Sequence, residues 1–560
     1  MKKILFFAIS ILWVVSACNK KKDKENVNAT KPVKVDLVVS NATIYTVDSA
    51  FSKAEAMAIH EGRVVFVGSL AQLNSMFVAK ESIDLGGANV YPGFSDPHCH
   101  FLGYARTLFN VDLTGTQSLN NVIEKTADFF GDSTSGWIQG RGWDQNDWGE
   151  SGWDVSQFPD KTKLDSLFPN NPVALRRVDG HALWVNSMAL QMGNITSKTR
   201  VRGGEVHLNT QGEPSGILLD NAADLVLDII PENIKERDAE AVQKAQSNCF
   251  AVGLTNLHDA GLPLNDVLFM YEQYKQGRLK IRINQMLSHD DETIDYFEKM
   301  GAIEMDHFWV KSIKCYMDGA LGSRGAWLKK PYHDAGGHTG LQLTQNNKMH
   351  DLLSRALKMN FQVNTHAIGD SAVANTLSLY AKYLKGKNDK RWRIEHNQVV
   401  EISDLSKYSA NSIIPSVQPT HATSDMYWAD ERLGNRIETA YAYQDLLATN
   451  GWIINGSDFP VEHINPLYGF YAAVARMDQQ GNPKGGFQIE NALTREQALR
   501  AMTIWAAKGA FLEDELGSLE VGKRADFVVL EKDLITAPIN ELYKISVLKT
   551  FINGELVFEH

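Results

Sequence analysis

The fold is decided by Tyr91-Pro92-Gly93-Phe94-Ser95-Asp96-Pro97-His98-Cys99-His100, where an apolar run stops at an acid, a proline and two histidines. In an extended chain the side chains at positions i and i+2 point to the same side, so His98 and His100 can present two imidazoles to one point. Two neutral imidazoles suit a borderline divalent metal such as zinc. A chance His-x-His in a loop is the alternative, and residues further along the chain favour the metal.

The overall composition limits the class of protein. At 560 residues the chain is too long for one ordinary core, so we expect two or more domains. A hydrophobic content of 44% with 22% charged residues is typical of a soluble globular protein. The formal net charge of −11, without a long basic run in the body of the chain, argues against nucleic acid as the main partner.

Residues 1–17 predict a signal peptide that plays no part in the fold, because a short basic start precedes an apolar stretch too short to span a membrane stably. The segment Val15-Ser16-Ala17-Cys18 resembles the lipobox of bacterial lipoproteins, which implies cleavage before Cys18 and lipid attachment to its sulfur. A plain secretory signal is the alternative. Residues 18–34 are polar and predict a solvated tether. We therefore expect an exported lipoprotein, anchored to the membrane and facing the periplasm or the cell surface.

Both ends of the mature chain have the pattern of short strands. Alternating β-branched residues between Asn, Asp and Gly turns occur from Val35 to Gly68, and the same pattern returns from Gly522 to Leu530 and from Val547 to Val557. A lone hairpin is only marginally stable. We predict that residues 35–90 and 510–560 pair into one composite β-sandwich domain.

The middle of the chain, residues 91–509, alternates short apolar runs with helical stretches, which predicts an α/β fold with a TIM-like (β/α)8 barrel. The strand before His98 and seven later runs give eight candidates, and Pro172 to Val178 would be a ninth, so one is surplus. The seven runs are Leu254 to Asp259, Ile281 to Leu287, Val310 to Tyr316, Phe361 to His366, Trp392 to His396, Ile413 to Gln418 and Trp452 to Asp458.

A segment at about 114–231 does not follow this alternation, and we interpret it as an insertion after the first barrel strand. It contains five tryptophans, Trp137, Trp143, Trp148, Trp153 and Trp184. Tryptophans over the barrel mouth could line a substrate pocket. A small separate apolar core is the alternative.

Three later candidate strands end on a residue type that binds metals: His366, His396 and Asp458. The strands of a barrel end at the same rim, so these side chains are expected to meet although they are far apart in sequence. Together with the His-x-His motif they predict a metal centre at that rim.

These motifs resemble the metal-dependent amidohydrolase superfamily, and within it the YtcJ-like group, amidohydrolase family 3, which includes N-substituted formamide deformylases. The resemblance covers nearly all of the mature chain. It is carried by Pro-Gly-Phe-Ser-Asp-Pro-His-Cys-His at 92–100, Arg-Gly-Trp-Asp-Gln-Asn at 141–146, Asp-Gly-His-Ala-Leu-Trp-Val-Asn at 179–186, Lys-Cys-Tyr-Met-Asp-Gly-Ala-Leu-Gly-Ser-Arg at 314–324, Thr-His-Ala-Ile-Gly-Asp at 365–370, Ile-Glu-His at 394–396, Ser-Val-Gln-Pro-Thr-His at 416–421, Gly-Ser-Asp-Phe-Pro-Val at 456–461 and Gly-Lys-Arg-Ala-Asp-Phe at 522–527.

The resemblance implies a divalent metal, zinc in the first instance, with one or two ions. The ligands that it implies are His98, His100, Lys314, His366, His396 and Asp458. Asp458 would also be the general base, and His396 or His421 would steady the oxyanion. Lys314 matches the position of a carboxylated lysine that bridges two metals, which requires a neutral amine. Asp318 as the oxygen ligand of a single metal, or an ion pair between Lys314 and an acid, are the alternatives.

Four residues are candidates for substrate contact: His181, Trp143, Arg324 and His421. Arg324 could grip a carboxylate through two hydrogen bonds, although a structural ion pair would explain it equally well. Glu395 points away from its neighbour His396 by strand alternation and is expected to support the ligands from behind.

The function implied by this resemblance is hydrolysis of a C–N bond, other than a peptide bond, in a small amide, N-formyl compound or cyclic amide. A deaminase, a dipeptidase or a lactonase would use the same centre. A different class, a non-catalytic lipoprotein that captures a ligand, would predict loss of ligand residues, and every expected position is filled. The expected partners are a small-molecule substrate and, through Cys18, the membrane, and a homodimer is left open.

Overall fold

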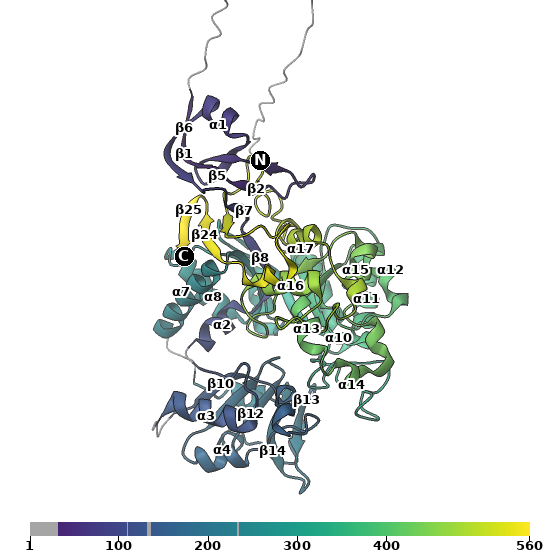
Figure 1. The fold of residues 1–560 in the computed structure, drawn as a ribbon. Helices are drawn as coiled ribbons and strands as arrows, with labels where there is room; N and C mark the ends of the chain where they lie inside the picture. Colours follow the sequence, from purple (N-terminus) through teal and green to yellow (C-terminus); the bar gives the residue numbers. More distant parts are fainter. Residues whose placement is uncertain (1–31, 109, 132–135, 232–234) are drawn as a thin grey trace, which may run out of the picture.

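The computed structural model describes residues 32–108, 110–131, 136–231 and 235–560, so the predicted signal peptide and Cys18 lie outside the described part. Figure 1 shows three regions along the molecule: sheets built from the chain ends, a central barrel with its helices, and a further sheet with short helices on the opposite side. Within the described residues, we find no helix with the length and apolar character needed to cross a membrane.

The central region is a sheet of eight parallel strands with helices outside it, which confirms the predicted barrel. Its strands in chain order are β8 (Phe94–Cys99), β15 (Leu254–Leu262), β16 (Arg282–Leu287), β18 (Phe308–Tyr316), β19 (Gln362–Ala367), β20 (Arg393–His396), β21 (Ile414–Val417) and β22 (Ile454–Asn455). A short strand, β17 (Ile303–Glu304), pairs antiparallel with β18 outside this path.

The barrel is nearly closed by contacts between the first strand and the residues after the last one. Asp458 donates its backbone N–H to the carbonyl of His98 at 2.7 Å, and His100 donates to the carbonyl of Phe459 at 2.8 Å. The buried carboxylate of Asp96 accepts the Ser457 hydroxyl at 2.6 Å. Gly456 permits this approach, because a Cβ there would lie 2.7 Å from the backbone nitrogen of His98. The segment that carries His98 and His100 therefore also closes the barrel, because it is hydrogen-bonded to the residues that follow the last strand.

Amphipathic helices cover the outside of the barrel. In α10 (Asn346–Met359), four residues at the spacing of one helical face are buried: Met349, Leu352, Leu353 and Ala356. The main covering helices are α7 (Lys235–Ala251), α8 (Leu264–Lys275), α9 (Asp291–Met300), α10 (Asn346–Met359), α11 (Asp370–Leu384), α12 (Ile402–Ala410), α15 (Tyr443–Asn450) and α16 (Pro466–Ala475).

The two chain ends share one sheet, as predicted for a composite β-sandwich. Strand β23 (Phe527–Leu530) runs antiparallel to β7 (Asn89–Pro92), with Val528 opposite Tyr91. The full order is β25 (Glu555–Glu559), β24 (Val547–Ile552), β23, β7, β2 (Thr43–Tyr45) and β3 (Lys53–Ala54). A second sheet holds β5 (Arg63–Gly68), β4 (Ala56–His60), β1 (Val33–Ser40) and β6 (Phe77–Asp84), so β1 begins inside the predicted tether.

The insertion builds its own sheet, and this identifies the surplus strand. The segment predicted at 172–178 is β11 (Val173–Arg177), which pairs with β10 (Ile138–Trp143) and β12 (Ala182–Val185) instead of joining the barrel. The remaining strands are β9 (Val111–Asp112), β14 (Pro214–Asp220) and β13 (Gly204–Leu208). Helices α3 (Leu119–Phe130) and α4 (Thr162–Leu167) lie beside it in Figure 1, and α5 (Ser187–Met192) contacts β11.

Three of the insertion's tryptophans form a separate apolar core. Trp143, Trp148 and Trp184 are completely buried, and the Trp143 ring centroid lies 6.1 Å from that of Trp148 and 5.9 Å from that of Trp184. Trp143 also donates its indole N–H to the carbonyl of Leu175 at 2.8 Å. Trp143 is therefore part of the insertion's own core, and it is not among the residues that line the cavity described below.

Candidate metal centre

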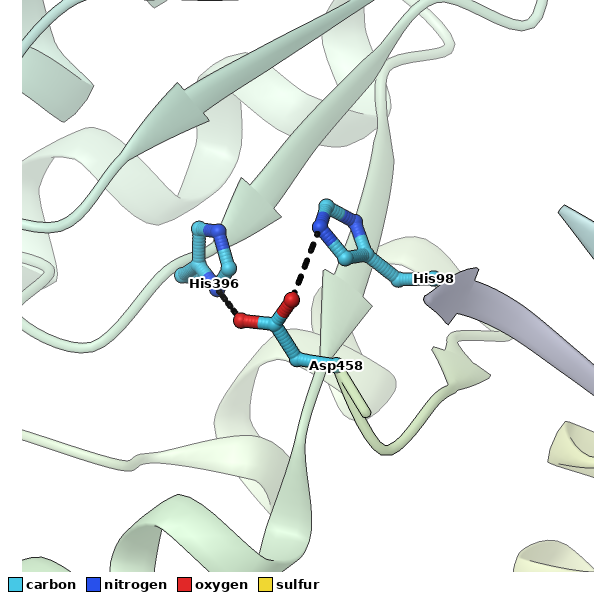
Figure 2. Close-up of side chains that lie close together, drawn as sticks. All are labelled: His98, His396 and Asp458. Atoms are coloured by element: carbon cyan, nitrogen blue, oxygen red, sulfur yellow. Dashed lines mark ion pairs between the residues drawn. The ribbon is translucent and has the colours of Figure 1, made fainter. Parts of the chain in front are cut away.

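Three barrel strands deliver His98, His396 and Asp458 to one point at the rim (Figure 2). One potential ligand atom from each residue lies within 4.8 Å of the other two, and all three side chains are buried. The carboxylate oxygens of Asp458 lie 3.5 Å from His98 Nε2 and 3.9 Å from His396 Nδ1. His98 near the end of β8, His396 at the end of β20 and Asp458, three residues beyond β22, thus meet at one rim, as the barrel geometry predicts.

The other implied ligands surround this group. His100 Nε2 lies 3.1 Å from Asp458 Oδ1, and Lys314 Nζ lies 3.2 Å from His98 Nε2. The ring of His366 lies 4.4 Å from that of His396, centroid to centroid. All six residues that the resemblance implies as ligands therefore gather in one region, although they come from six different positions along the barrel.

The backbone at two of these residues is held in an unfavourable conformation. His396 has φ of 78° and Asp458 has φ of 65°, in the left-handed region that non-glycine residues rarely adopt. Such conformations cost of order 1 kcal/mol or more and persist only where the surrounding structure enforces them. Here they end a strand and turn the side chain into the rim, as expected for a functional site.

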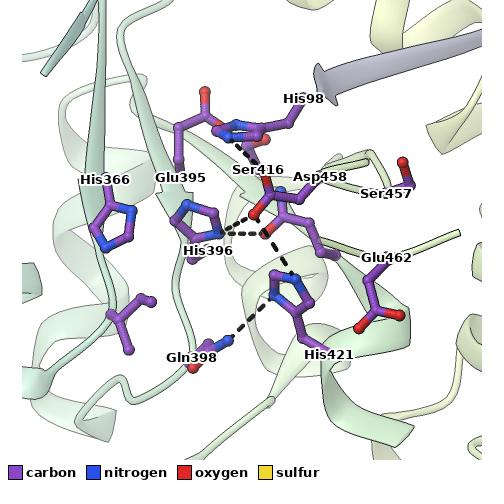
Figure 3. Close-up of polar contacts among 12 residues, drawn as sticks. His98, His366, Glu395, His396, Gln398, Ser416, His421, Ser457, Asp458 and Glu462 are labelled. Carbon is purple, nitrogen blue, oxygen red and sulfur yellow. Dashed lines mark hydrogen bonds and ion pairs between the residues drawn. The ribbon is translucent and has the colours of Figure 1, made fainter. Parts of the chain in front are cut away.

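A second layer of polar groups orients the candidate ligands (Figure 3). Glu395 Oε2 lies 2.7 Å from His98 Nδ1, so this carboxylate fixes the ring and leaves Nε2 directed at the rim. Gln418 Oε1 lies 2.9 Å from His396 Nδ1. Carboxylate contacts of this kind fix the tautomer and raise the basicity of a metal-binding histidine. Glu395 therefore lies behind a candidate ligand, as the sequence predicts, and that ligand is His98.

The protonation states of the site suit metal binding. Burial lowers the pKa of His366 and of His396 well below the ordinary value, and lowers the pKa of His421 to about 4. Burial raises the pKa of Asp458, but the neighbouring histidines, His98 first, outweigh it and hold this pKa well below 3.8. Neutral imidazoles and an ionised carboxylate are the forms that coordinate a metal.

The hydrogen bonding of the site leaves room for a cation. His421 Nε2 is buried and has no hydrogen-bond partner among the described residues, and buried Asp458 Oδ1 lies 3.1 Å from His100 Nε2 and 3.5 Å from His98 Nε2 without hydrogen-bond geometry to either ring. Buried polar atoms normally find a partner, so each such atom calls for an explanation. A divalent cation held by the nitrogen and oxygen donors of this rim supplies one, and the residues present fit such an ion.

Lys314 and Asp318, the two alternatives for a bridging ligand, have different surroundings. Lys314 is 1% exposed, and within the described ranges its Nζ forms no ion pair with an acid. Asp318 is fully buried and accepts the backbone N–H groups of Trp327, Ile368 and Gly369 at 2.8, 3.0 and 2.8 Å. Asp318 therefore ties the loops of the rim together, while Lys314 points at the ligand cluster.

A cavity of about 620 Å³ opens above the rim, lined by the barrel on one side and the insertion on the other. His181 lines it, and its Nδ1 lies 2.7 Å from Asp220 Oδ1. His421 is not among the residues that line it, but its Nε2 lies 3.8 Å from Asp458 Oδ2. Arg324 does not line it, because its guanidinium binds Asp334 at 2.8 Å. The structural ion pair, which the sequence left open for Arg324, is the arrangement found.

Several cavity residues were not singled out from the sequence. Arg141 and Arg176 line it from the insertion, and His289 and Tyr316 from the barrel. Arg141 opens the motif at 141–146, and alternation along its strand would have placed it opposite the apolar face. No local signal marks His289, because only the packing of its loop brings it to the rim.

Comparison with known proteins identifies the family. A family described as "Amidohydrolase family" matches residues 81–558. The "Putative amidohydrolase YtcJ" of Bacillus subtilis is 30% identical over 526 residues, covering 92% of this chain and 98% of that protein. The "N-substituted formamide deformylase" of Arthrobacter pascens is 26% identical over 551 residues, covering 94% and 98%. This chain therefore belongs to the amidohydrolase family.

The fold agrees with this assignment. The crystal structure of an uncharacterized metal-dependent hydrolase from Pyrococcus horikoshii OT3 superposes with a TM-score of 0.73 and 24% identity. The match covers 90% of this chain and 99% of that one, so it includes the barrel, the chain-end sheets and the insertion. The predicted superfamily and fold class are both confirmed.

Proposed function

We propose that this chain hydrolyses a C–N bond in a small amide, N-formyl compound or cyclic amide, with Asp458 as the general base. The observation that carries the proposal is the convergence of His98, His396 and Asp458 at the rim, buried below a cavity large enough for a small molecule. The name of the Arthrobacter relative supports a substrate with an N-formyl group.

The residues of the rim have separate roles in this proposal. His98, His100, His366 and His396 would hold the metal through neutral ring nitrogens, with Glu395 fixing His98 from behind. A divalent metal bound there supplies a water of lowered pKa and polarises the substrate carbonyl. Asp458, whose low pKa keeps it ionised, accepts a proton from that water and later delivers it to the leaving nitrogen.

The balance of the reaction is simple. The C–N bond breaks, the hydroxyl of water joins the carbonyl carbon, and the remaining proton goes to nitrogen by way of Asp458. His421, which lies 3.8 Å from Asp458 Oδ2, is suited to steady the developing charge beside it. We further propose that the neutral amine of Lys314, which lies 3.2 Å from His98 Nε2, adds carbon dioxide and loses a proton to form a carbamate, and that this group would help to hold the metal.

The test is metal removal and replacement. Purified protein should contain one or two zinc-like ions, lose turnover of N-formyl amines with a chelator and recover it with zinc. The variant His98→Ala should lose both bound metal and activity. The matched control is His350→Ala, a histidine of α10 whose Nδ1 lies 2.9 Å from Tyr383 Oη. Full activity in metal-free protein would contradict the proposal, and metal content gives a readout that does not depend on knowing the substrate.

We also propose that the chain is exported and carries lipid on Cys18, on the strength of the lipobox alone. Metabolic labelling with a fatty acid should mark the wild-type protein, and Cys18→Ala should abolish the label. No label on the wild-type protein would favour a plain secretory signal, and a label that survives Cys18→Ala would favour another anchor.

A further inference from the structure

Three arginines line the cavity above the candidate metal centre, and they differ in their partners. Arg106 binds two carboxylates, Asp238 at 2.8 Å and Asp266 at 2.7 Å. Arg141 and Arg176 form no ion pair within the described ranges. Two cations without a counterion therefore face a space open to small molecules.

These two arginines are neighbours by register. Strands β10 and β11 are parallel, and Arg141 pairs with Arg176 across them, so their side chains stand on the same face of the sheet. Like charges opposite one another destabilise a sheet. On the other side of β10, Arg141 pairs with Asp112, but that carboxylate accepts the Thr114 N–H at 3.0 Å and forms no ion pair with Arg141.

The two faces of this sheet have different tasks. Ile138, Val173 and Leu175 point into the buried core that contains the tryptophans. Arg141 and Arg176 alternate with them and reach the cavity instead. That second face is partly apolar, because Ala174 and Leu183 on it belong to another buried cluster of the insertion, and Arg141 and Arg176 lie on the part that lines the cavity.

Both guanidinium groups are held by a hydrogen bond to a backbone carbonyl, and each has further N–H donors. Arg141 donates to the carbonyl of Val178 at 2.9 Å, and Arg176 donates to the carbonyl of Gly180 at 3.1 Å. Gly180, with φ of 78°, leaves space for Arg141, because a Cβ there would lie 3.4 Å from Nη1. Arg141 Nε is buried and has no partner among the described residues. Each fork thus keeps N–H groups free for a ligand.

The electrostatics agree with an uncompensated charge. Burial first, and then the charge of Arg176, lower the pKa of Arg141 to about 10, although Asp458 and Asp179 act in the opposite direction. The acids that line the same cavity have partners of their own: Asp179 binds Arg177, Asp220 contacts His181, Asp259 accepts the Phe101 N–H and Asp266 binds Arg106. Asp224 is exposed and, although its charge acts on Arg176, the two form no ion pair.

We propose that Arg141 and Arg176 form a binding site for a carboxylate on the substrate, so that the natural substrate is an amide or N-formyl compound that carries a free carboxylate on one side of the scissile bond. This inference rests on the proposed function, which places the scissile bond at the rim. Guanidinium forks bind a carboxylate through paired, charge-assisted hydrogen bonds. The barrel then supplies the reaction, and the insertion selects the substrate.

The experiment compares paired substrates that differ only in the carboxylate. N-formylphenylalanine is paired with N-formylphenethylamine, and further N-formyl and N-acetyl amino acids are paired with the amides that lack the acid. Zinc-loaded wild type should show a kcat/KM about 10- to 100-fold higher for the acid of a pair, the range expected for hydrogen bonds to a charged group. Arg141→Gln and Arg176→Gln should each raise KM for the acid by about 10-fold or more and leave the uncharged partner nearly unchanged.

Controls separate recognition from folding and from chemistry. Arg200→Gln is the matched control, because Arg200 belongs to the same insertion and, among the residues that the structure describes, donates only to the carbonyls of Ser197 and Thr199. Arg176→Lys keeps the charge but loses the fork and should fall between wild type and Arg176→Gln. Unchanged metal content in each variant shows that the rim is intact.

Binding without turnover completes the test. Calorimetric titration of the Asp458→Asn variant with the same acids should give binding that Arg141→Gln weakens about 10-fold or more. Equal use of acids and uncharged amides, with no effect of either arginine, overturns the carboxylate site and leaves the hydrolase proposal standing. Arginine-dependent binding of the acids without turnover of any amide overturns the hydrolase proposal and supports the site. Failure of every acid to bind or react overturns the carboxylate site.

Discussion

The barrel rim and the insertion sheet both contribute to one cavity, but their polar residues are held in opposite ways. At the rim, every candidate ligand has a supporting contact or a neighbouring ligand, as His98 has with Glu395 at 2.7 Å. On the insertion sheet, Arg141 and Arg176 lie side by side without an acid. The difference indicates that the rim is arranged for a cation and the insertion for an anion. Reaction and recognition are thus assigned to different parts of the chain.

The largest effect that this comparison predicts is at Asp458. Asp458→Asn should lower kcat for every substrate by about 10³-fold or more, because it removes the group that moves the proton. Steady-state kinetics on charged and uncharged amides checks this, with the exposed Asp445→Asn in α15 as control. A loss confined to the charged substrates would mean that Asp458 serves recognition, and the contrast between the two regions would fail.

The second prediction concerns pH, because the two regions hold histidines of opposite character. Burial lowers the pKa of His421 to about 4, whereas at His181 the contact with Asp220 outweighs burial and raises the pKa. The unfolded chain takes up protons at His421 from about pH 6.5 downward and the folded chain does not, so this residue costs stability as pH falls towards 4. His181 has the opposite sign, and its stabilisation is lost as pH rises through its folded pKa.

This contrast can be measured on metal-free protein by denaturant unfolding at pH 7 and pH 4.5. His421→Gln should lose less stability than wild type on acidification, by on the order of 2 kcal/mol. His181→Gln should lose more than wild type over the same interval. Equal losses in all three proteins would show that the two histidines do not differ in this way.

A third prediction tests how the rim is supported. Glu395→Gln should weaken zinc binding by about 10- to 100-fold, because His98 loses the carboxylate that orients it. Competition with a chelating dye measures the affinity. The exposed Glu438→Gln is the control, and it should bind zinc like the wild type. The preference for carboxylate-bearing substrates should survive in metal-saturated Glu395→Gln, since the insertion is untouched.

The smallest predicted effect concerns the core of the insertion. Trp143→Phe should lower the free energy of unfolding by about 1–2 kcal/mol, through the lost hydrogen bond to Leu175 and the smaller ring. Thermal unfolding measures this, with the half-exposed Trp153→Phe as the matched comparison. Changes in substrate preference without loss of stability would mean that Trp143 contacts the substrate after all.

The sequence alone was sufficient to predict the features that depend on the pattern of residues within one segment. Strand alternation places His98 and His100 on one side of β8, and the strand ends place His396 and Asp458 at one rim. The pairing of the chain ends was predictable for the same reason, because neither end can bury its apolar face alone. Substrate contacts were predicted less well: Trp143 and Arg324 turned out to be committed to the core and to Asp334.

Only the tertiary structure decided which apolar run was surplus and which face of the insertion meets the barrel. The run at 172–178 has the composition of a barrel strand, and nothing within it reveals that β10 and β12 are its neighbours. The pairing of Arg141 with Arg176 likewise arises from a register between strands that are more than thirty residues apart. The residue types and the hydrophobic periodicity of a strand can be read from its own segment. The neighbouring strand with which it pairs is decided by long-range packing. A site shared by the barrel and the insertion therefore exists only once both have folded.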